Sequence, residues 1–313
     1  MFTVLIAEAA MAVFFPQRII QYRADDIFFT RYDPDIGWVN KEGASGKWSQ
    51  APSSVPPTTI RINDMGFRGG DFYADKKPGN KRVVVLGDSN TFGYGVEENE
   101  RFTERLSERL PKNYEVLNLG VFGYGTDQEF LIFERKGLVL DPDVVVLGFS
   151  AGDLSDNMNS INAGFSKPYF KIEGEELVLK NTPVPDSLIY LKGKSRESSV
   201  MNFFYRHSHL FRLAMYRLSA SHIYASGSMP EMSEQEALRT TVAIIKLMND
   251  MCIEKGCRFV VFLISHEAWA AANSKRPGLN IGYYSDLKNW LNEMGVSFID
   301  TTELFGRDYG RGE

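Results

Sequence analysis

A serine that follows a strongly apolar segment is the first candidate for chemistry. Residues 82–87 form a continuous apolar run ending in glycine, which is typical of a parallel strand buried on both faces. Ser89 comes next, at a glycine-rich turn into a helical pattern. Such a turn exposes the hydroxyl and places the serine amide near a helix start, which suits a nucleophile whose transition state develops negative charge on oxygen. The alternative is a turn in which the serine only caps a helix.

Two later loops contain groups that such a nucleophile needs. Residues 118–125 follow a second predicted strand and contain three glycines, whose N–H groups could donate to an oxyanion. The same glycines could instead form a tight strand-to-helix connection. Residues 150–157 are polar and follow a third predicted strand, where they could also be a turn that leads into a helix.

These three loops can form one site only if the strands that precede them belong to the same sheet. Strand patterns alternate with helical patterns from about residue 81 onward, which predicts right-handed βαβ units and a parallel sheet covered by helices on both faces. Ligands bind such sheets beyond the carboxyl ends of the strands, where all three loops begin. The predicted strands are 82–87, 114–118, 143–149, 258–264 and 296–300, and the predicted helices are 102–110, 128–136, 233–254 and 284–294.

The rest of the chain divides around this pattern. We expect an apolar helix or anchor remnant over residues 1–23, an irregular segment over 24–80, and the main domain over 81–313 with an insertion at about 151–232. The apolar run 1–15 is shorter than the about 20 residues of a spanning helix. It is therefore either the end of a membrane anchor, which the following arginines favour, or a short helix packed on the domain.

Composition excludes several classes of protein. The net charge is −5, without a clustered basic face for nucleic acid, and the short basic cluster at 76–82 is expected to be a solvated start of a strand. Cys252 and Cys257 lack the spacing of a zinc or redox motif, so we expect no metal and no cofactor. Tyr94 stands where a phosphate-binding loop needs lysine.

The order of the three loops resembles the SGNH (GDSL-type) hydrolase superfamily. Gly87-Asp88-Ser89 is similar to its first block, which implies Ser89 as nucleophile. Residues 118–123 are similar to the second block, which implies that the N–H groups of Ser89 and Gly123, or less well Gly120, form the oxyanion hole. Residues 62–68 resemble a segment of one membrane-associated bacterial branch.

The resemblance covers about residues 30–302 and carries several expectations. The fold is a three-layer α/β/α sandwich with a parallel five-stranded sheet of flavodoxin-like order. The reaction is hydrolysis or transfer of acyl or acetyl groups, with a small-molecule or cell-envelope carbohydrate ester as substrate. A membrane-anchored or cell-envelope location is favoured over a cytoplasmic one, with anchoring through residues 1–15.

The chain departs from the third block of the family. Asparagine should stand before aspartate there and donate the third hydrogen bond to the oxyanion. Gly152 occupies that position before Asp153, although Asn157 or Asn159 could reach in. Losing one such donor typically lowers the rate by about 10²- to 10³-fold.

The chain also lacks the C-terminal Asp-x-x-His block that supplies the general base. Residues 301–313 contain no histidine, so the chain looks truncated or degenerate. His207, His209 and His222 lie in the insertion and are expected to be solvated or to pack, whereas His266 follows the fourth strand and is the candidate for a displaced base. The alternative to an active esterase is therefore an impaired or inactive binding domain of the same fold.

Overall fold

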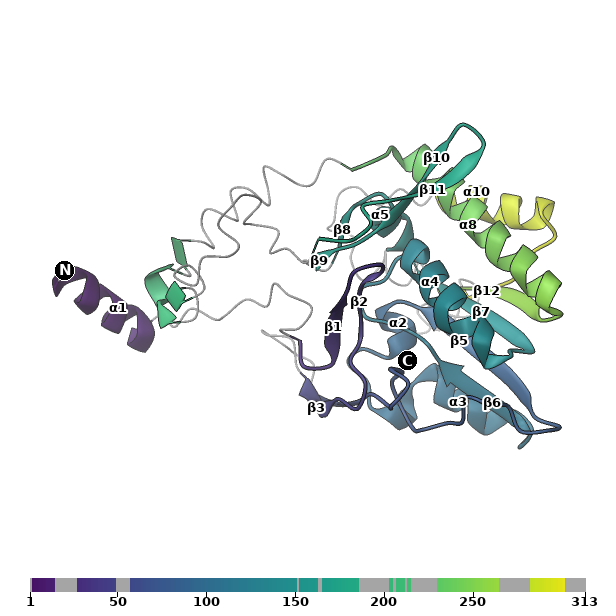
Figure 1. The fold of residues 1–313 in the computed structure, drawn as a ribbon, viewed down its shortest axis with the longest axis horizontal. Helices are drawn as coiled ribbons and strands as arrows, with labels where there is room; N and C mark the ends of the chain where they lie inside the picture. Colours follow the sequence, from purple (N-terminus) through teal and green to yellow (C-terminus); the bar gives the residue numbers. More distant parts are fainter. Residues whose placement is uncertain are drawn as a thin grey trace, which may run out of the picture.

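The computed structural model describes most of the chain (Figure 1). The described residues are 2–14, 27–48, 57–150, 152–162, 165–185, 203–204, 207–211, 213–214, 230–264 and 282–301.

Five parallel strands form the central sheet. They are β5 (Lys81–Gly87), β6 (Tyr114–Asn118), β7 (Val144–Phe149), β12 (Arg258–Leu263) and β13 (Ser297–Asp300). Their order in the sheet is β13-β12-β7-β5-β6, and every pairing is parallel. In chain order this is the flavodoxin-like arrangement, with the second strand at one edge beside the first. The predicted fold class and all five predicted strands are confirmed.

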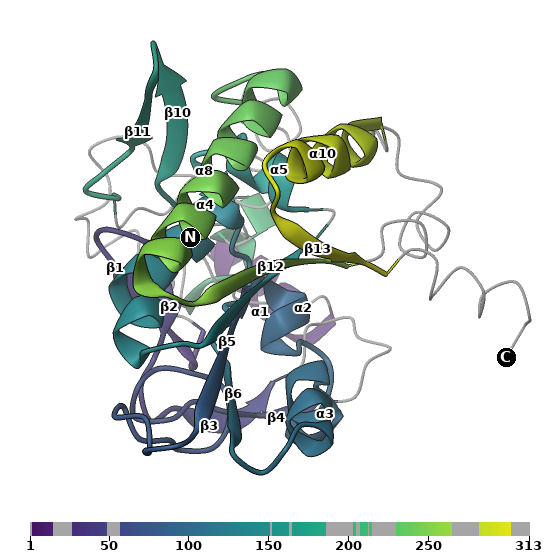
Figure 2. The same cartoon turned by 90° about the vertical axis from the view of Figure 1, so that its right-hand side faces the viewer.

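Helices cover both faces of this sheet. Their bounds are α2 Ser89–Phe92, α3 Phe102–Arg109, α4 Thr126–Ile132, α8 Glu234–Lys255 and α10 Gly282–Glu293, with short 3-10 turns at Glu98–Glu100 and Leu138–Leu140. Figure 2 shows α2 and α3 on one side of the strands and α4 with α8 on the other, and α10 contacts α8. The helix predicted over 128–136 is divided, because α4 is followed by a π-helical turn at Phe133–Gly137.

The hydrophobic core fills the space between these layers. Val84 and Leu86 of β5 and Ile244 and Met248 of α8 are fully buried in one cluster. Burying each such side chain contributes about 1.5–3 kcal/mol. Helix α8 begins with the capping box predicted from its sequence, in which Ser233 accepts a hydrogen bond from the backbone N–H of Glu236 at 3.3 Å.

The segment before the sheet, which was expected to be irregular, contains two antiparallel ribbons. Their strands are β1 (Thr30–Asp33) paired with β2 (Gly37–Asn40), and β3 (Ser45–Trp48) paired with β4 (Thr58–Arg61). Phe29 is fully buried and stacks on Phe92 of α2 at a ring distance of 5.5 Å. Trp38 is also fully buried and packs against Tyr124. This segment therefore shares the core of the sheet domain.

The insertion after β7 contains small elements. They are α5 (Asp153–Asn157), β8 (Ile161–Asn162), β9 (Phe165–Ser166), β10 (Tyr169–Glu173) and β11 (Glu176–Lys180), and the predicted hairpin is the β10–β11 pair. The helical piece expected after residue 200 lies only partly within the described residues.

The N-terminal α1 (Phe2–Phe14) is apolar and contacts the later part of the insertion. The carboxylate of Glu8 accepts hydrogen bonds from the hydroxyl of Ser208 at 2.7 Å and from the N–H of Leu210 at 3.0 Å. Among the helices within the described residues, none has both the length and the apolar character needed to span a membrane.

At the amino end of the sheet, the fully buried Arg82 joins β5 to the neighbouring strand β6. The Nε and Nη2 groups of Arg82 donate to Glu115 of β6 at 3.0 and 2.8 Å. Its remaining N–H groups donate to the carbonyls of Tyr73, Ala74 and Leu140 at 2.7–3.0 Å. The expectation of a solvated basic cluster is therefore wrong for Arg82, because all five of its donors have internal acceptors.

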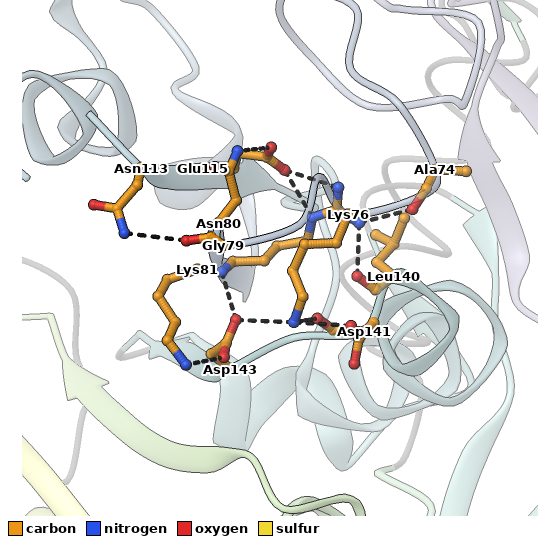
Figure 3. A network of polar contacts seen from close by, with 11 residues as sticks. Ala74, Lys76, Gly79, Asn80, Lys81, Asn113, Glu115, Leu140, Asp141 and Asp143 are labelled. Carbon is orange, nitrogen blue, oxygen red and sulfur yellow. Dashed lines mark hydrogen bonds and ion pairs between the residues drawn. The ribbon is translucent and has the colours of Figure 1, made fainter. Parts of the chain in front are cut away.

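The carboxylate of Asp143 completes this network. It accepts hydrogen bonds from Lys81 at 2.8 Å, from Lys76 at 3.0 Å and from the backbone N–H of Arg82 at 2.8 Å (Figure 3). Burial alone would raise the pKa of Asp143, but these three donors outweigh it and lower the pKa to about 2. The network fixes the starts of β5 and β7 at the end of the sheet opposite to Ser89.

Candidate active site

The turn after β5 places Ser89 at the carboxyl edge of the sheet. Asp88 caps α2, since its carboxylate accepts the N–H of Asn90 at 2.8 Å and also a hydrogen bond from the N–H of Thr91. Ser89 is half-buried. Within the part of the chain that the structure describes, the Ser89 hydroxyl makes no hydrogen bond. The sequence-predicted nucleophile is thus partly accessible and not engaged as a structural group.

The glycine-rich loop after β6 lies directly against the Ser89 turn. A Cβ atom on Gly120 would come within 2.7 Å of the carbonyl carbon of Thr91, so only glycine allows this approach. Asn118 donates to the carbonyl of Thr91 at 2.6 Å, and the N–H of Val121 donates to the carbonyl of Gly87 at 3.0 Å. The structure therefore brings together the first two predicted loops.

The N–H groups of Ser89 and Gly123 are the donors that the sequence predicts for an oxyanion. No acceptor for the N–H of Ser89 or of Gly123 is found among the described residues. Gly123 has φ +76°, a left-handed conformation that glycine adopts without strain. The carbonyls of its loop are engaged, because Phe122 accepts from Trp38 at 2.9 Å and Gly123 from Asn162 at 2.8 Å. Backbone N–H groups without an acceptor can stabilise an oxyanion when they lie close to the nucleophile.

A buried arginine from the N-terminal segment holds the far end of α2. The guanidinium of Arg68 donates to the carbonyls of Phe92 and Gly93, and to that of Val96 at 2.8 Å. Burial, followed by repulsion from Arg101, lowers the pKa of Arg68 to about 10, so it stays charged at neutral pH. Through this contact, the segment 62–68 helps to position the Ser89 turn. The sequence analysis identified this segment only by its resemblance to a family.

The loop after β7 contacts the same turn through a serine between two carboxyl groups. The hydroxyl of Ser150 lies 2.9 Å from Asp88 Oδ2 and 2.8 Å from Asp153 Oδ1. One hydroxyl proton cannot serve both contacts, so one of the two carboxyl groups must carry a proton. Burial raises the pKa of both carboxyl groups, and the charge of Asp88 raises that of Asp153 further, so both sites favour a shared proton.

Asn157 and Asn159, the candidates for the third hydrogen-bond donor to the oxyanion, have other partners. Asn157 is buried, its Nδ2 donates to Thr241 at 2.8 Å, and its Oδ1 accepts the N–H of Asp127 at 3.2 Å. Asn159 donates to the carbonyl of Ser155 at 2.6 Å. The Asn157 amide therefore helps to hold the insertion against the domain, whereas the Asn159 amide bonds within the insertion.

A buried group of charged residues lies beneath these loops and was not foreseen. Lys167 and Asp127 are both fully buried and form an ion pair. Glu129 is also fully buried, and neither of its oxygens has a hydrogen-bond partner among the described residues. Burial and then repulsion from Asp153 raise the pKa of Glu129 well above its ordinary value, which favours the neutral form of this carboxyl. In sequence, this segment resembles an ordinary polar helix start.

The histidines are only partly placed. His222, His266 and the tail from residue 302 lie outside the described residues. His207 is exposed and packs against the ring of Phe203 at 4.7 Å. The described ranges hold no group of three or more His, Cys, Asp or Glu side chains arranged to bind a metal ion.

Comparison with known proteins gives distant similarities only. No family model and no curated protein matches the chain. The chain is similar to AlinE4, an SGNH-hydrolase family esterase (12% identity, 71% of this chain and 76% of that chain, TM-score 0.36). It is also similar to a GDSL-like lipase from Bacteroides thetaiotaomicron (12% identity, 70% of this chain and 67% of that chain, TM-score 0.34). A third similar structure is a catalytic mutant of Axe2, an acetylxylan esterase from Geobacillus stearothermophilus (11% identity, 74% of this chain and 83% of that chain, TM-score 0.39). At these identities and TM-scores the similarity carries no inference about the reaction of this chain.

Proposed function

We propose that the chain is an SGNH-type serine ester hydrolase, with Ser89 as nucleophile and the N–H groups of Ser89 and Gly123 as oxyanion hole. The observation that carries the proposal is the pattern of used and unused polar groups. Around the Ser89 turn, the side chains of Asp88, Asn118 and Ser150 are all hydrogen-bonded. The hydroxyl of Ser89 and the two N–H groups are not hydrogen-bonded among the described residues.

In this reaction Ser89 Oγ attacks the ester carbonyl carbon and the carbonyl oxygen becomes an oxyanion. The two N–H groups donate to that oxygen, where removing one donor typically costs about 10²- to 10³-fold in rate. The alcohol then leaves, and water or a sugar hydroxyl takes the acyl group from the serine. The hydroxyl proton needs a base, for which His266 remains the candidate from the sequence.

Acyl or acetyl esters of cell-envelope carbohydrate are the proposed substrates, by the resemblance of residues 62–68. The same resemblance supports membrane association through residues 1–15 as part of the proposal.

The second candidate function is a binding domain that has lost catalysis. Two observations favour it. Gly152 supplies no side chain at the position of the third oxyanion donor. His207 and His209, the histidines within the described residues, belong to the insertion and not to loops at the carboxyl ends of the strands.

Covalent labelling with a fluorophosphonate and turnover of a short-chain aryl ester test the proposal. Labelling and turnover should disappear in Ser89→Ala and persist in Ser107→Ala, a matched control on α3. An unlabelled and inactive wild-type protein would reject the esterase and leave the binding domain. His266→Ala should abolish turnover if this histidine is the base, and unchanged turnover would remove it from the mechanism.

A further inference from the structure

The position of the missing third donor is open, and one carboxyl group faces it. Gly152 has φ −75° and ψ −30°, a conformation that any residue adopts. A Cβ atom built there would have Asp156 Oδ2 at 3.5 Å and Ser150 Oγ at 3.7 Å as its nearest neighbours. A side chain at residue 152 would therefore fit, and the closest group to its start is the carboxyl of Asp156.

Asp156 also reaches the loop that carries the proposed oxyanion N–H. The side chain of Asn162 hydrogen-bonds to the Asp156 carboxylate and donates to the carbonyl of Gly123 at 2.8 Å. A Cβ atom built on Gly125 would lie 3.0 Å from the Cβ of Asp156. The carboxyl group thus lies between the second and third loops, one hydrogen-bonded side chain away from Gly123.

The surroundings of Asp156 favour its neutral form. Burial raises its pKa to about 7, because burial outweighs the opposing effects of Lys167 and of the Asn162 hydrogen bond. Four other carboxyl groups repel its charge. They are Asp127 and Glu129 of α4, Asp88 of the Ser89 turn, and Asp153 of its own helix. A protonated carboxyl is an O–H donor, whereas a carboxylate only accepts.

We propose that Asp156 in its acid form donates the third hydrogen bond to the oxyanion, in place of the side chain that residue 152 lacks. This role rests on the proposed function of Ser89. A neutral carboxylic acid can serve an oxyanion hole when its site keeps it protonated. The sign of the pH effect follows: the donor is present below the pKa of Asp156 and is lost as pH rises through it.

The rate of Ser89 labelling by a fluorophosphonate, measured against pH, tests this role. Asp156→Asn keeps the shape of the side chain and donates through its amide at every pH, so the ratio of wild-type to variant rates cancels the titration of any base. We expect this ratio to fall about 100-fold between about pH 6 and about pH 9. At about pH 6, Asp156→Ala should be labelled about 100-fold more slowly than wild type, and adding Gly152→Asn should restore most of that rate.

A ratio that stays constant, or that rises with pH, would overturn the proposal, and a rise would mean that Asp156 acts as a base. No rescue by Gly152→Asn, in a variant that melts like wild type, would also overturn it. A wild-type protein that is folded but unlabelled at every pH is a different result, because it rejects Ser89 as nucleophile and Asp156 with it.

Discussion

Replacing Gly120 with alanine should push the second loop away from the nucleophile turn. The new Cβ atom would lie 2.4 Å from the backbone nitrogen of Phe92, where ordinary contacts are 3.4–4 Å, so one of the two segments must move by about 1 Å. Overpacking typically costs about 1–3 kcal/mol, and we expect the upper end because backbone cannot rotate away. At about 2 °C per kcal/mol for a domain of this size, the melting temperature should fall by about 6 °C.

If Ser89 and the Gly123 N–H act as proposed, the same shift should slow the labelling of Ser89 by about 10²-fold, because a displacement of about 1 Å misaligns the proposed oxyanion donors. Thermal unfolding and fluorophosphonate labelling measure the two effects. Gly70→Ala is the matched control, since Gly70 is exposed and its Cβ would meet only the end of the Arg61 side chain, at 3.3 Å. Wild-type melting and labelling in Gly120→Ala would mean that the two loops are not in contact.

Three further substitutions test the buried charges. Arg82→Met removes the partner of Glu115 and should lower the free energy of unfolding by about 3–5 kcal/mol in urea titration; a loss below about 1 kcal/mol would contradict its burial. Asp143 has a pKa of about 2 in the folded protein and about 3.9 when unfolded, so its stabilisation is present above about pH 4 and is lost as pH falls through about 2. Asp143→Asn should therefore cost about 2 kcal/mol at neutral pH and less than about 0.5 kcal/mol at about pH 2, and an equal cost at both would refute the assignment. Lys167→Met leaves Asp127 buried without its cation, so the variant should lose stability progressively as pH rises relative to wild type; a pH-independent loss would argue against the ion pair.

The strands of the sheet are predictable from sequence because burial on both faces imposes a simple pattern. Residues 82–87 and 143–149 each contain three consecutive valines in a mostly apolar run bounded by turns, and the structure confirms them as β5 and β7. The ribbons of the N-terminal segment were not predictable in this way. Their strands are four residues long and mix polar with aromatic residues, so tertiary packing against residues such as Phe92 determines them.

For the candidate site, residue type alone predicts which loops lie at the carboxyl edge of the sheet. Ser89 and Gly123 follow strands whose carboxyl ends meet at one edge, which is a consequence of the parallel sheet. Arg68, Glu129 and Asp156 could not be found from their types, because charged residues usually lie in solvent. Their burial depends on contacts between segments far apart in the chain, and these contacts exist only in the folded protein.

The most direct test of Ser89 is the structure of the protein after reaction with a fluorophosphonate. The adduct should lie on Ser89 Oγ, with the phosphonyl oxygen about 2.7–3.1 Å from the backbone nitrogens of Ser89 and Gly123. An adduct on another residue, or a phosphonyl oxygen turned away from both nitrogens, would contradict the assignment of this site.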